Sequence, residues 1–525
     1  TDKGNLVAVI SNGTAVLGLG DIGAMSGKPV MEGKGLLFKI YGGIDVFDIE
    51  VDEKDPEKFI QAVKAIAPTY GGINLEDIKA PECFEIERRL KEELDIPVMH
   101  DDQHGTAIIS CAGLLNALIV ANKKIEEVKI VVNGAGASAI SCTRLYCAFG
   151  ARKENIIMLD SKGVITDDRA NLTEQKKEFA TSRRDVHTLA EAVRGADVFV
   201  GLSKGNVLSK DMVRTMAERP IVFALANPQP EITYEDAIEA RPDVLMSTGR
   251  TDYPNQINNV LGFPYIFRGA LDTAARAINE EMKMAAVRAI AELARRPVPD
   301  IVNRAYQVRH LTFGPGYFIP KPVDPRLITE VSMAVAKAAM DSGVARTPIT
   351  DWKAYRQRLR ELMGQETKFT QNLFETVRLH PKRVVFAEGS HPKMLQAAVQ
   401  AKEEGFCHPV LLGNEEEIKR IADELELNLD GCELVNLRDN SESERRLRYA
   451  KILAQKRERE GFNLEVARDK MFERNYFGMM MVETGDADAF ITGLYTRYTG
   501  TIQAAKEVIG IRPGYEHFGA LHLVS

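Results

Sequence analysis

Two pairs of acidic residues, about 25 positions apart in a chain of 525 residues, could together hold one metal ion. They are Glu76-Asp77 in Gly-Gly-Ile-Asn-Leu-Glu-Asp-Ile and Asp101-Asp102 in His-Asp-Asp-Gln-His-Gly-Thr. Carboxylates from two loops can bind one hard divalent cation through oxygen ligands. His100 and His104 flank the second pair and leave zinc as an alternative, but the carboxylates and the missing cysteine ligands favour magnesium or manganese.

A glycine-rich turn of the dinucleotide-binding type follows these pairs. It follows an apolar segment and opens a helical pattern, and Asp160 ends the next predicted strand. Bare backbone at the glycines would let a pyrophosphate approach the helix N-terminus. We therefore predict that the turn binds a dinucleotide through Gly134, Ala135, Gly136, Ala137 and Ser138.

The cofactor could be NAD or NADP. Asp160 should bind a ribose hydroxyl, which favours NAD, whereas Ser161 and Lys162 directly after it could hold the 2′-phosphate of NADP. A metal ion next to a hydride acceptor indicates oxidation of a hydroxy acid followed by loss of CO2.

A second glycine string, Gly18-Leu-Gly-Asp-Ile-Gly23, follows a predicted strand at Ala15–Leu17. Gly27 and Pro29 argue against a helix directly after it. We expect a loop on the substrate or nicotinamide side, with a plain turn as the alternative.

The bulk composition is that of a globular protein, and a net charge of −7 argues against a general nucleic-acid surface. No apolar run reaches the ~18 residues of a membrane span, and no signal-peptide pattern is present. Six cysteines without a CxxC pair predict reduced thiols and a cytoplasmic location. The chain begins without methionine and ends in an apolar run, so we expect further segments on both sides.

Strands alternate with helices along most of the chain, which predicts α/β domains with parallel sheets. Early elements are a strand at Val7–Ile10 and helices at Pro56–Ala67 and Glu82–Glu93, and Ala270–Ala294 has the pattern of one long helix. The predicted domains are residues 1–115, 116–350 and 382–525, with a helical linker at 351–381.

Several strings together resemble malic enzymes. They are Asn5 to Asp21, Pro29 to Lys34, Gly71 to Asp77, Pro97 to Thr106, Ala226-Asn-Pro and Asn255 to Val260. The resemblance covers residues 1 to about 350, and the tail from about 382 resembles the start of a phosphate acetyltransferase domain. This combination is similar to the large bacterial hybrid malic enzymes. It implies an N-terminal α/β domain, a doubly wound Rossmann-type parallel sheet and a truncated transferase-like α/β domain.

The resemblance implies oxidative decarboxylation of (S)-malate to pyruvate and CO2, with reduction of NAD or NADP and with Mg2+ or Mn2+. It makes Lys34 the general base, ahead of its neighbours Lys28 and Lys39, and Asp101 either orients Lys34 or supports the metal ligands. The other implied roles are metal ligation by Glu76, Asp77 and Asp102, malate binding by Asn227 and Asn259, and cofactor binding by Asn227 and Asn258.

The family also uses a tyrosine as general acid, in a segment upstream of the matched region, so we assign no tyrosine here. Tyr41 and Tyr70 are expected to be structural.

The C-terminal tail carries the string from Gly485 to Gly493 in the style of the transferases, but Leu494 to Gly500 lacks their histidine. We therefore expect a domain that binds acetyl-CoA as an effector, with oligomer assembly as the alternative role, and a homo-oligomeric protein. The rival to the enzyme is a catalytically inactive sensor of NAD(P) and CoA. A malate dehydrogenase without decarboxylation usually needs no metal, so the carboxylates argue against it.

Overall fold

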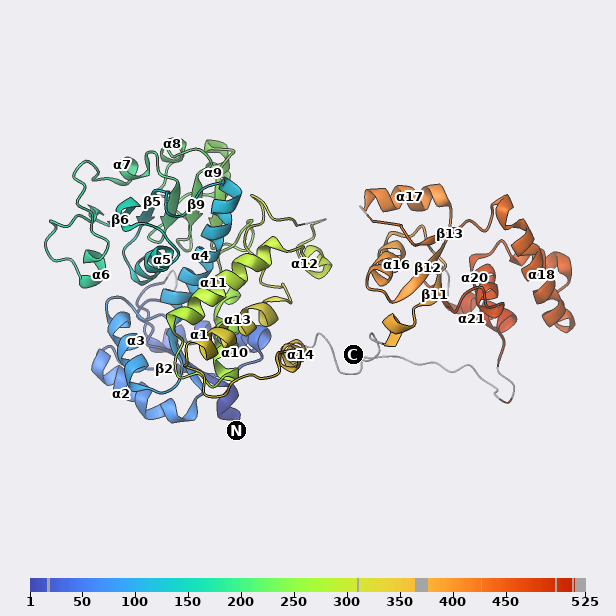
Figure 1. Cartoon of the computed structure of the whole chain (residues 1–525), viewed down its shortest axis with the longest axis horizontal. Helices are drawn as coiled ribbons and strands as arrows, with labels where there is room; N and C mark the ends of the chain where they lie inside the picture. Colours follow the sequence, from blue (N-terminus) through green and yellow to red (C-terminus); the bar gives the residue numbers. More distant parts are fainter. Residues whose placement is uncertain are drawn as a thin grey trace. The chain divides into compact units, whose positions relative to one another are not determined.

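A computed structural model of the chain divides into two compact units, residues 1–365 and 366–525 (Figure 1). The structure describes residues 1–16, 19–308, 311–363, 376–425, 427–495, 498–511 and 514. Leu17 and Gly18 of the second glycine string, and residues 364–375 of the predicted linker, therefore lie outside the described residues.

The first four strands form a parallel sheet with the order β2-β1-β3-β4. The central strand β1 is buried, as its unbroken apolar run from Val7 to Ile10 indicates. Helices connect the strands, as parallel pairing requires, and β1, α2 and α3 confirm the elements predicted there. The bounds are β1 (Leu6–Ser11), α1 (Ala24–Gly42), β2 (Asp45–Glu50), α2 (Pro56–Ile66), β3 (Gly72–Leu75), α3 (Glu82–Glu93) and β4 (Val98–His100).

Helix α1 shows that the prediction for the segment after the second glycine string was wrong. The helix begins at Ala24 and continues through Pro29 to Gly42. Pro29 lacks the N–H that would bond the carbonyl of Met25, but both residues are exposed, so water can take that bond. Burial of Met31 and Phe38 on the opposite face outweighs the lost bond. The predicted strand at Ala15–Leu17 is also wrong, because Val16 forms only an isolated bridge to Gly20.

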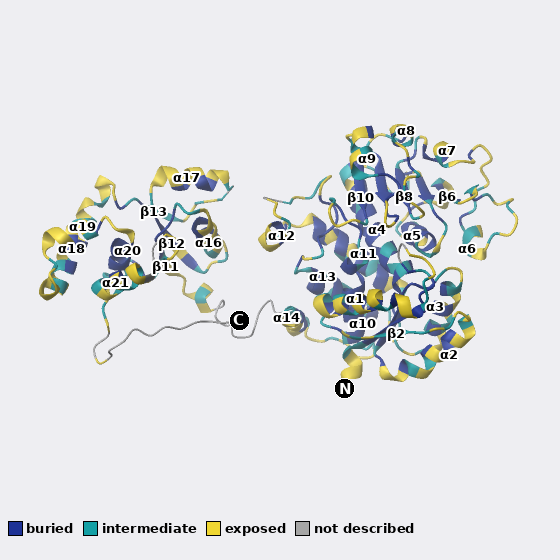
Figure 2. Cartoon of the chain, turned by 180° about the vertical axis from the view of Figure 1, so that it is seen from behind, coloured by how far each residue is buried: buried dark blue, intermediate teal, exposed yellow. Residues whose placement is uncertain are grey.

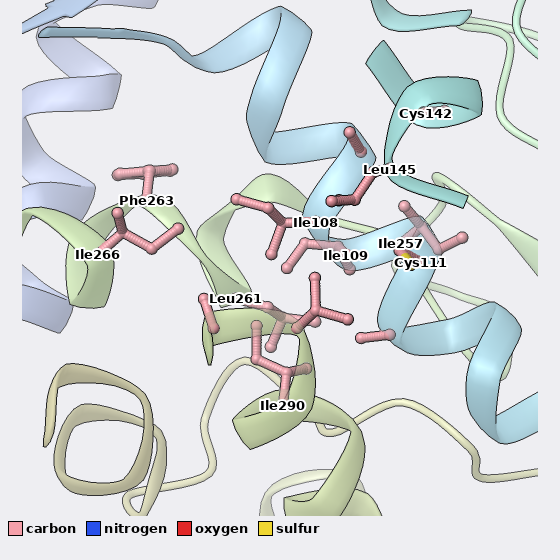
Figure 3. Close-up of a cluster of buried hydrophobic side chains, with 14 of the residues drawn as sticks. Ile108, Ile109, Cys111, Cys142, Leu145, Ile257, Leu261, Phe263, Ile266 and Ile290 are labelled. Carbon is pink, nitrogen blue, oxygen red and sulfur yellow. The ribbon is translucent and has the colours of Figure 1, made fainter. Parts of the chain in front are cut away.

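Helix α4 (Asp101–Ala121) follows β4 without a loop and was not predicted. It is long and apolar enough to cross a membrane by length and composition, yet 72% of that stretch is buried inside the protein. Figure 3 shows its Ile108, Ile109 and Cys111 packed against side chains of α5 (Ala137–Ala148), α10 (Phe263–Asp272) and α11 (Glu280–Arg295). This burial identifies α4 as the central core helix of the first unit and fixes the direction of its first turn.

The second sheet has six strands in the order β10-β9-β8-β5-β6-β7, parallel except for the β6–β7 hairpin. The order reverses at β5, which confirms the doubly wound Rossmann-type sheet and places its ligand crevice at the ends of β5 and β8. The bounds are β5 (Ile130–Asn133), α5 (Ala137–Ala148), β6 (Ile156–Asp160), β7 (Gly163–Val164), α6 (Glu174–Lys177), α7 (Leu189–Val193), β8 (Val198–Gly201), α8 (Lys210–Arg214), β9 (Ile221–Ala224), α9 (Tyr234–Ala240) and β10 (Leu245–Thr248).

The single helix predicted at Ala270–Ala294 is wrong, because the chain breaks into α10 and α11. Ala274 adopts a left-handed φ of 46° after α10, and the side chain of Asn279 caps the start of α11 by accepting the N–H of Met282. The bounds in this region are η4 (Asn259–Leu261), α10 (Phe263–Asp272), α11 (Glu280–Arg295), α12 (Asp300–Ala305), α13 (Leu327–Asp341) and α14 (Trp352–Leu362).

The second unit contains a four-stranded parallel sheet with the order β13-β12-β11-β14. Strand β12 is mostly buried and β11 is buried only at its carboxyl end, and Figure 2 shows helices with exposed outer faces next to them. The bounds are β11 (Lys382–Phe386), α16 (Pro392–Glu403), β12 (Cys407–Leu412), α17 (Glu415–Glu424), β13 (Glu433–Val435), α18 (Ser443–Arg457), α19 (Leu464–Lys470), α20 (Arg474–Glu483), β14 (Ala489–Ile491) and α21 (Tyr498–Val508).

Gly269 tests the packing of α10 against α13. A Cβ at this position would lie 2.7 Å from the carbonyl oxygen of Ser332 and 2.9 Å from Cβ of Val335. We predict that Gly269→Ala lowers the free energy of unfolding of the first unit by about 1–3 kcal/mol, because the helices must separate. Urea unfolding followed by the fluorescence of Trp352, the single tryptophan, would measure this.

Gly33→Ala is the matched control, because no atom lies within 4 Å of the Cβ position at that helical glycine. Here the free energy of unfolding should stay constant or rise by up to about 1 kcal/mol. Equal destabilisation by the two changes would contradict the packing argument.

Candidate active site

The acidic pairs meet because β3 and β4 are parallel neighbours whose carboxyl ends lie at the same edge of the sheet. Glu76 and Asp77 directly follow β3, and Asp102 lies in the first turn of α4. One carboxylate oxygen from each of these three residues lies within 4.8 Å of the other two. The three predicted metal ligands are thus brought together, two on the loop after β3 and one on the first turn of α4.

The electrostatics of this cluster fit a divalent cation. Burial, together with the charges of neighbouring carboxylates, raises the pKa of Glu76 to about 8 and that of Asp102 to about 6, although Lys34 lowers both. Such shifts mean that the ionised carboxylates repel one another and lack sufficient compensating charge. An all-oxygen donor set of this kind suits Mg2+ or Mn2+ better than zinc.

Lys34 projects from α1 into the same cluster. Its Nζ donates to Asp101 Oδ2 and, at 3.1 Å, to Glu76 Oε1, and it lies 4.0 Å from the centre of the Phe263 ring. Burial lowers the pKa of Lys34, but the charges of Asp101 and Glu76 raise it by more, so its pKa lies above the ordinary value.

The rival lysines of the same helix face elsewhere. Lys28 pairs with Asp48 and Glu50 of β2, and the exposed Lys39 pairs with Asp45. Of the three lysines, Lys34 is therefore the one that faces the acidic cluster.

Asp101 is fully buried and is shared between Lys34 and Asn259. The amide nitrogen of Asn259 donates to Asp101 Oδ2 at 3.0 Å, and its oxygen accepts from the Thr106 hydroxyl at 3.1 Å. A Cβ at Gly105 would lie 2.2 Å from Asp101 Oδ1, which explains the glycine in His-Gly-Thr. Asn259, which we expected at the malate, thus holds the carboxylate next to Lys34.

Two contacts that fix the metal-ligand carboxylates escaped the sequence analysis. The buried Asn74 donates its amide N–H to Glu76 Oε2 at 2.7 Å, and the backbone N–H of Asp77 donates to Asp102 Oδ2 at 2.7 Å. Asp77 adopts a left-handed φ of 55°, which turns the chain so that this N–H faces the other loop. Asn74 stands two residues before Glu76 in a strand, so alternation to the same face could have indicated it.

The dinucleotide turn borders a cavity of about 780 Å3, whose lining includes Gly134, Ala135, Gly136, Asp160, Ser161 and Lys176. Gly134 has a left-handed φ of 135°, and a Cβ there would lie 2.5 Å from the carbonyl oxygen of Leu202. Gly136 has no atom within 4 Å of its Cβ position, which leaves room at the start of α5. This geometry suits close approach of a pyrophosphate.

Ser138, which we expected at the cofactor, also bridges the two parts of the site. Its hydroxyl donates to the backbone carbonyl of Asp102 at 2.7 Å. Helix α5, whose N-terminus borders the predicted cofactor cavity, is therefore hydrogen-bonded to the first turn of α4, which carries a candidate metal ligand.

Asp160 is bound by two cationic side chains that the sequence analysis missed. Nη2 of Arg169 lies 3.0 and 2.9 Å from its two oxygens, and Nζ of Lys176 lies 3.0 Å from Oδ2. Burial opposes ionisation, but these bonds lower the pKa of Asp160 to about 2. Lys162 contributes its backbone N–H to the same carboxylate.

The remaining predicted residues are Asn227, in the loop after β9, and Asn258, directly before η4. Asn227 precedes a cis proline and packs against Gly249, and the side chain of Asn258 accepts the N–H of Val260 at the start of η4. The buried Glu231, which was not predicted, accepts the N–H groups of Ser203 and Ala226 and so joins the loops after β8 and β9.

Comparison with known protein families gives three matches along the chain. Residues 2–91 match the malic enzyme N-terminal domain, residues 103–303 the malic enzyme NAD-binding domain, and residues 368–525 the phosphate acetyl/butaryl transferase family.

Some relatives align with nearly the whole chain. The chain is 51% identical over 524 residues to an NADP-dependent malic enzyme of Salmonella typhimurium, which covers 99% of this chain and 69% of the relative. It is 48% identical over 535 residues to an NAD-dependent malic enzyme of Rhizobium meliloti, covering 100% and 68% of the two chains. Among solved structures, a malic enzyme from Pyrococcus horikoshii superposes with a TM-score of 0.61 at 42% identity, over 72% of this chain and 84% of that one.

Proposed function

The chain belongs to the malic enzyme family, and we propose that it converts (S)-malate to pyruvate and CO2 with reduction of NADP+ and with Mg2+ or Mn2+. The observation that carries the proposal is the convergence of Glu76, Asp77 and Asp102 within 4.8 Å of one another, facing Lys34. The hydrogen bond from Ser138 to Asp102 links this cluster to the helix that borders the dinucleotide cavity. A hydride acceptor bound in that cavity would therefore lie next to the cluster.

Glu76, Asp77 and Asp102 supply the ligands for the ion. A divalent cation held there would polarise the C2 oxygen of malate as a Lewis acid and offset the negative charge around Lys34. That offset matters because Asp101 and Glu76 otherwise favour the ammonium form of Lys34.

Lys34 is the proposed general base. Its neutral amine would take the proton of the C2 hydroxyl, and Asp101 would hold the resulting ammonium. A nicotinamide bound in the dinucleotide cavity would be the hydride acceptor. Asn259 in turn donates a hydrogen bond to Asp101. The orientation of Lys34 is therefore set by hydrogen bonds that run from Asn259 through Asp101. Phe263 covers Lys34 and limits access of water to it.

The charges around Asp160 support NADP+ over NAD+. A carboxylate that already binds Arg169 and Lys176 is a weaker acceptor for ribose hydroxyls. Two cationic side chains thus face one carboxylate, and one of them, Lys176, lines the cavity. A 2′-phosphate, which carries roughly −1.5 to −2 charges, suits this excess.

The activity itself is tested by following NADPH and pyruvate formation from malate with Mn2+, with and without EDTA. We predict that EDTA abolishes both products and that Lys34→Gln lowers kcat by about 10²–10⁴-fold, because proton transfer is lost. Lys39→Gln, on the same helix but exposed and paired with Asp45, serves as the control and should act as wild type. Pyruvate formation that survives EDTA would refute the metal-dependent mechanism.

The cofactor preference is tested with Lys176→Gln. We predict that kcat/KM for NADP+ falls about 10- to 100-fold, since a hydrogen bond to a charged group contributes about 1.5–3 kcal/mol, while kcat/KM for NAD+ changes little. Lys177→Gln is the matched control, because Lys177 is the next residue of α6 and pairs with Glu174 at the surface. Equal loss for both cofactors would count against a 2′-phosphate contact.

We further propose that the second unit binds acetyl-CoA as an effector. Support comes from its match to the phosphate acetyl/butaryl transferase family and from its sheet, whose order reverses at β11, where ligands of doubly wound folds bind. At this point the buried Glu388 accepts from the Thr492 hydroxyl and from the N–H groups of Gly493, Leu494 and Tyr495.

Acetyl-CoA should change the malate dependence or the rate of the whole chain by about 5- to 150-fold, the usual range of coupling between sites. Steady-state rates at saturating NADP+ measure this, because acetyl-CoA also carries a phosphorylated adenosine that could compete in the cofactor cavity. An effect that vanishes at saturating NADP+ would show competition instead of regulation.

A further inference from the structure

Behind the carboxylate cluster lies a row of polar side chains that the proposed mechanism does not use. Glu87 of α3, His104 of α4 and Lys283 of α11 come from three helices, and Glu87 and Lys283 are only 6% and 2% exposed. Both carboxylate oxygens of Glu87 lie 2.9 Å from His104 Nε2, and Lys283 Nζ lies 3.1 Å from His104 Nδ1. The three side chains therefore form one continuous chain of hydrogen bonds.

The chemistry of its two ends sets the direction of this chain. A lysine ammonium can only donate, and an ionised carboxylate can only accept. His104 must therefore accept from Lys283 at Nδ1 and donate to Glu87 from Nε2, so it is neutral with its proton on Nε2.

Oε1 of Glu87 also reaches the turn before the candidate metal ligand. Oε1 accepts the backbone N–H of His100 at 3.0 Å and also pairs with Lys91 at 2.7 Å. His100 ends β4 and His104 lies in the second turn of α4, so Glu87 holds the chain on both sides of Asp101-Asp102.

We propose that Glu87 is a positioning residue for the metal site, which clamps the β4–α4 turn through His100 and His104 and so aims Asp102 at Glu76 and Asp77. The proposal rests on the metal-dependent function above. Partners of metal ligands commonly change metal affinity about 10- to 100-fold when they are removed.

The clamp requires a carboxylate and not an amide. All three groups that face Glu87, the N–H of His100, the Nε2–H of His104 and the ammonium of Lys91, are donors, so both oxygens must accept. A glutamine offers one acceptor and one donor, and therefore places its amide N–H group against at least one of these donors.

The first test measures direct binding of Mn2+ to the whole chain, and the electron paramagnetic resonance signal of free Mn2+ gives the unbound fraction. Glu87→Gln should raise the Kd for Mn2+ by about tenfold or more and raise the KM for malate. Glu92→Gln is the matched control, because Glu92 lies on the same helix but pairs with Arg88 at the surface, and it should stay within about twofold of wild type.

A second substitution can reverse the donor-to-acceptor direction of the hydrogen bonds through His104. In Glu87→Gln/Lys283→Gln, the amide of residue 87 donates to Nε2 of His104, and Nδ1–H of His104 donates to the amide oxygen of residue 283. A cavity of about 260 Å3 borders His104 and Lys283, so the shorter side chain at 283 leaves space that water can fill. Because the two changes are coupled through His104, the double variant should recover Mn2+ affinity to within about threefold of wild type, although Glu87→Gln alone does not.

His104 gives an independent arm if Glu87→Gln fails to fold. His104→Gln keeps one donor for Glu87 and one acceptor for Lys283 and should bind Mn2+ within about threefold of wild type, whereas His104→Leu should lose about tenfold or more. Equal affinity of these two variants, wild-type affinity of Glu87→Gln, or a double variant weaker than Glu87→Gln would overturn the clamp. Failure of the wild-type chain to bind Mn2+ would instead overturn the metal-dependent function.

Discussion

Mutual repulsion of carboxylates is the constraint on which the first unit depends. Glu76, Asp77, Asp101 and Asp102 converge at one edge of a sheet, and Lys34 is the cation placed among them. Burial and, after it, the neighbouring like charges shift these groups towards the neutral form and raise the pKa values of Glu76 and Asp102. The fold must therefore hold these groups together against a force that would separate them, and it does so with rigid elements on every side.

The rigidity comes from apolar burial and not from the polar contacts alone. Helix α4 carries Asp101 and Asp102 in its first turn, and its remaining length is packed in the centre of the core (Figure 3). Moving that turn would move a helix whose apolar side chains touch α5, α10 and α11. Hydrogen bonds from Asn74, Asn259 and the backbone of Asp77 then set the direction of each carboxylate, which the core by itself cannot do.

The sequence predicted the doubly wound sheet well, because each strand is a short apolar run followed by a helix and the glycines mark the turns. It failed where tertiary packing overrode local preference. Pro29 and Gly27 argue against α1, yet burial of Met31 and Phe38 holds the helix together, so Lys34 stands on a rigid helix and not in a loop. The candidate ligands could be named from the sequence, but their partners could not. Arg169 and Lys176 reach Asp160 only through the β6–β7 hairpin, and Glu87 reaches His104 from another helix.

The bond from Ser138 to Asp102 has a consequence for how the two halves of the site work together. It joins the first turn of the cofactor helix α5 to the backbone of a candidate metal ligand. A dinucleotide bound at the N-terminus of α5 would therefore contact a helix that is hydrogen-bonded to the β4–α4 turn. Glu87 is hydrogen-bonded to the same turn from α3. Because this turn is fixed from both sides, a shift of the cofactor helix cannot be absorbed by a flexible loop and must reach the carboxylate. Any coupling between dinucleotide binding and cation binding that runs through this hydroxyl group would be reciprocal, so each ligand would change the binding free energy of the other by the same amount.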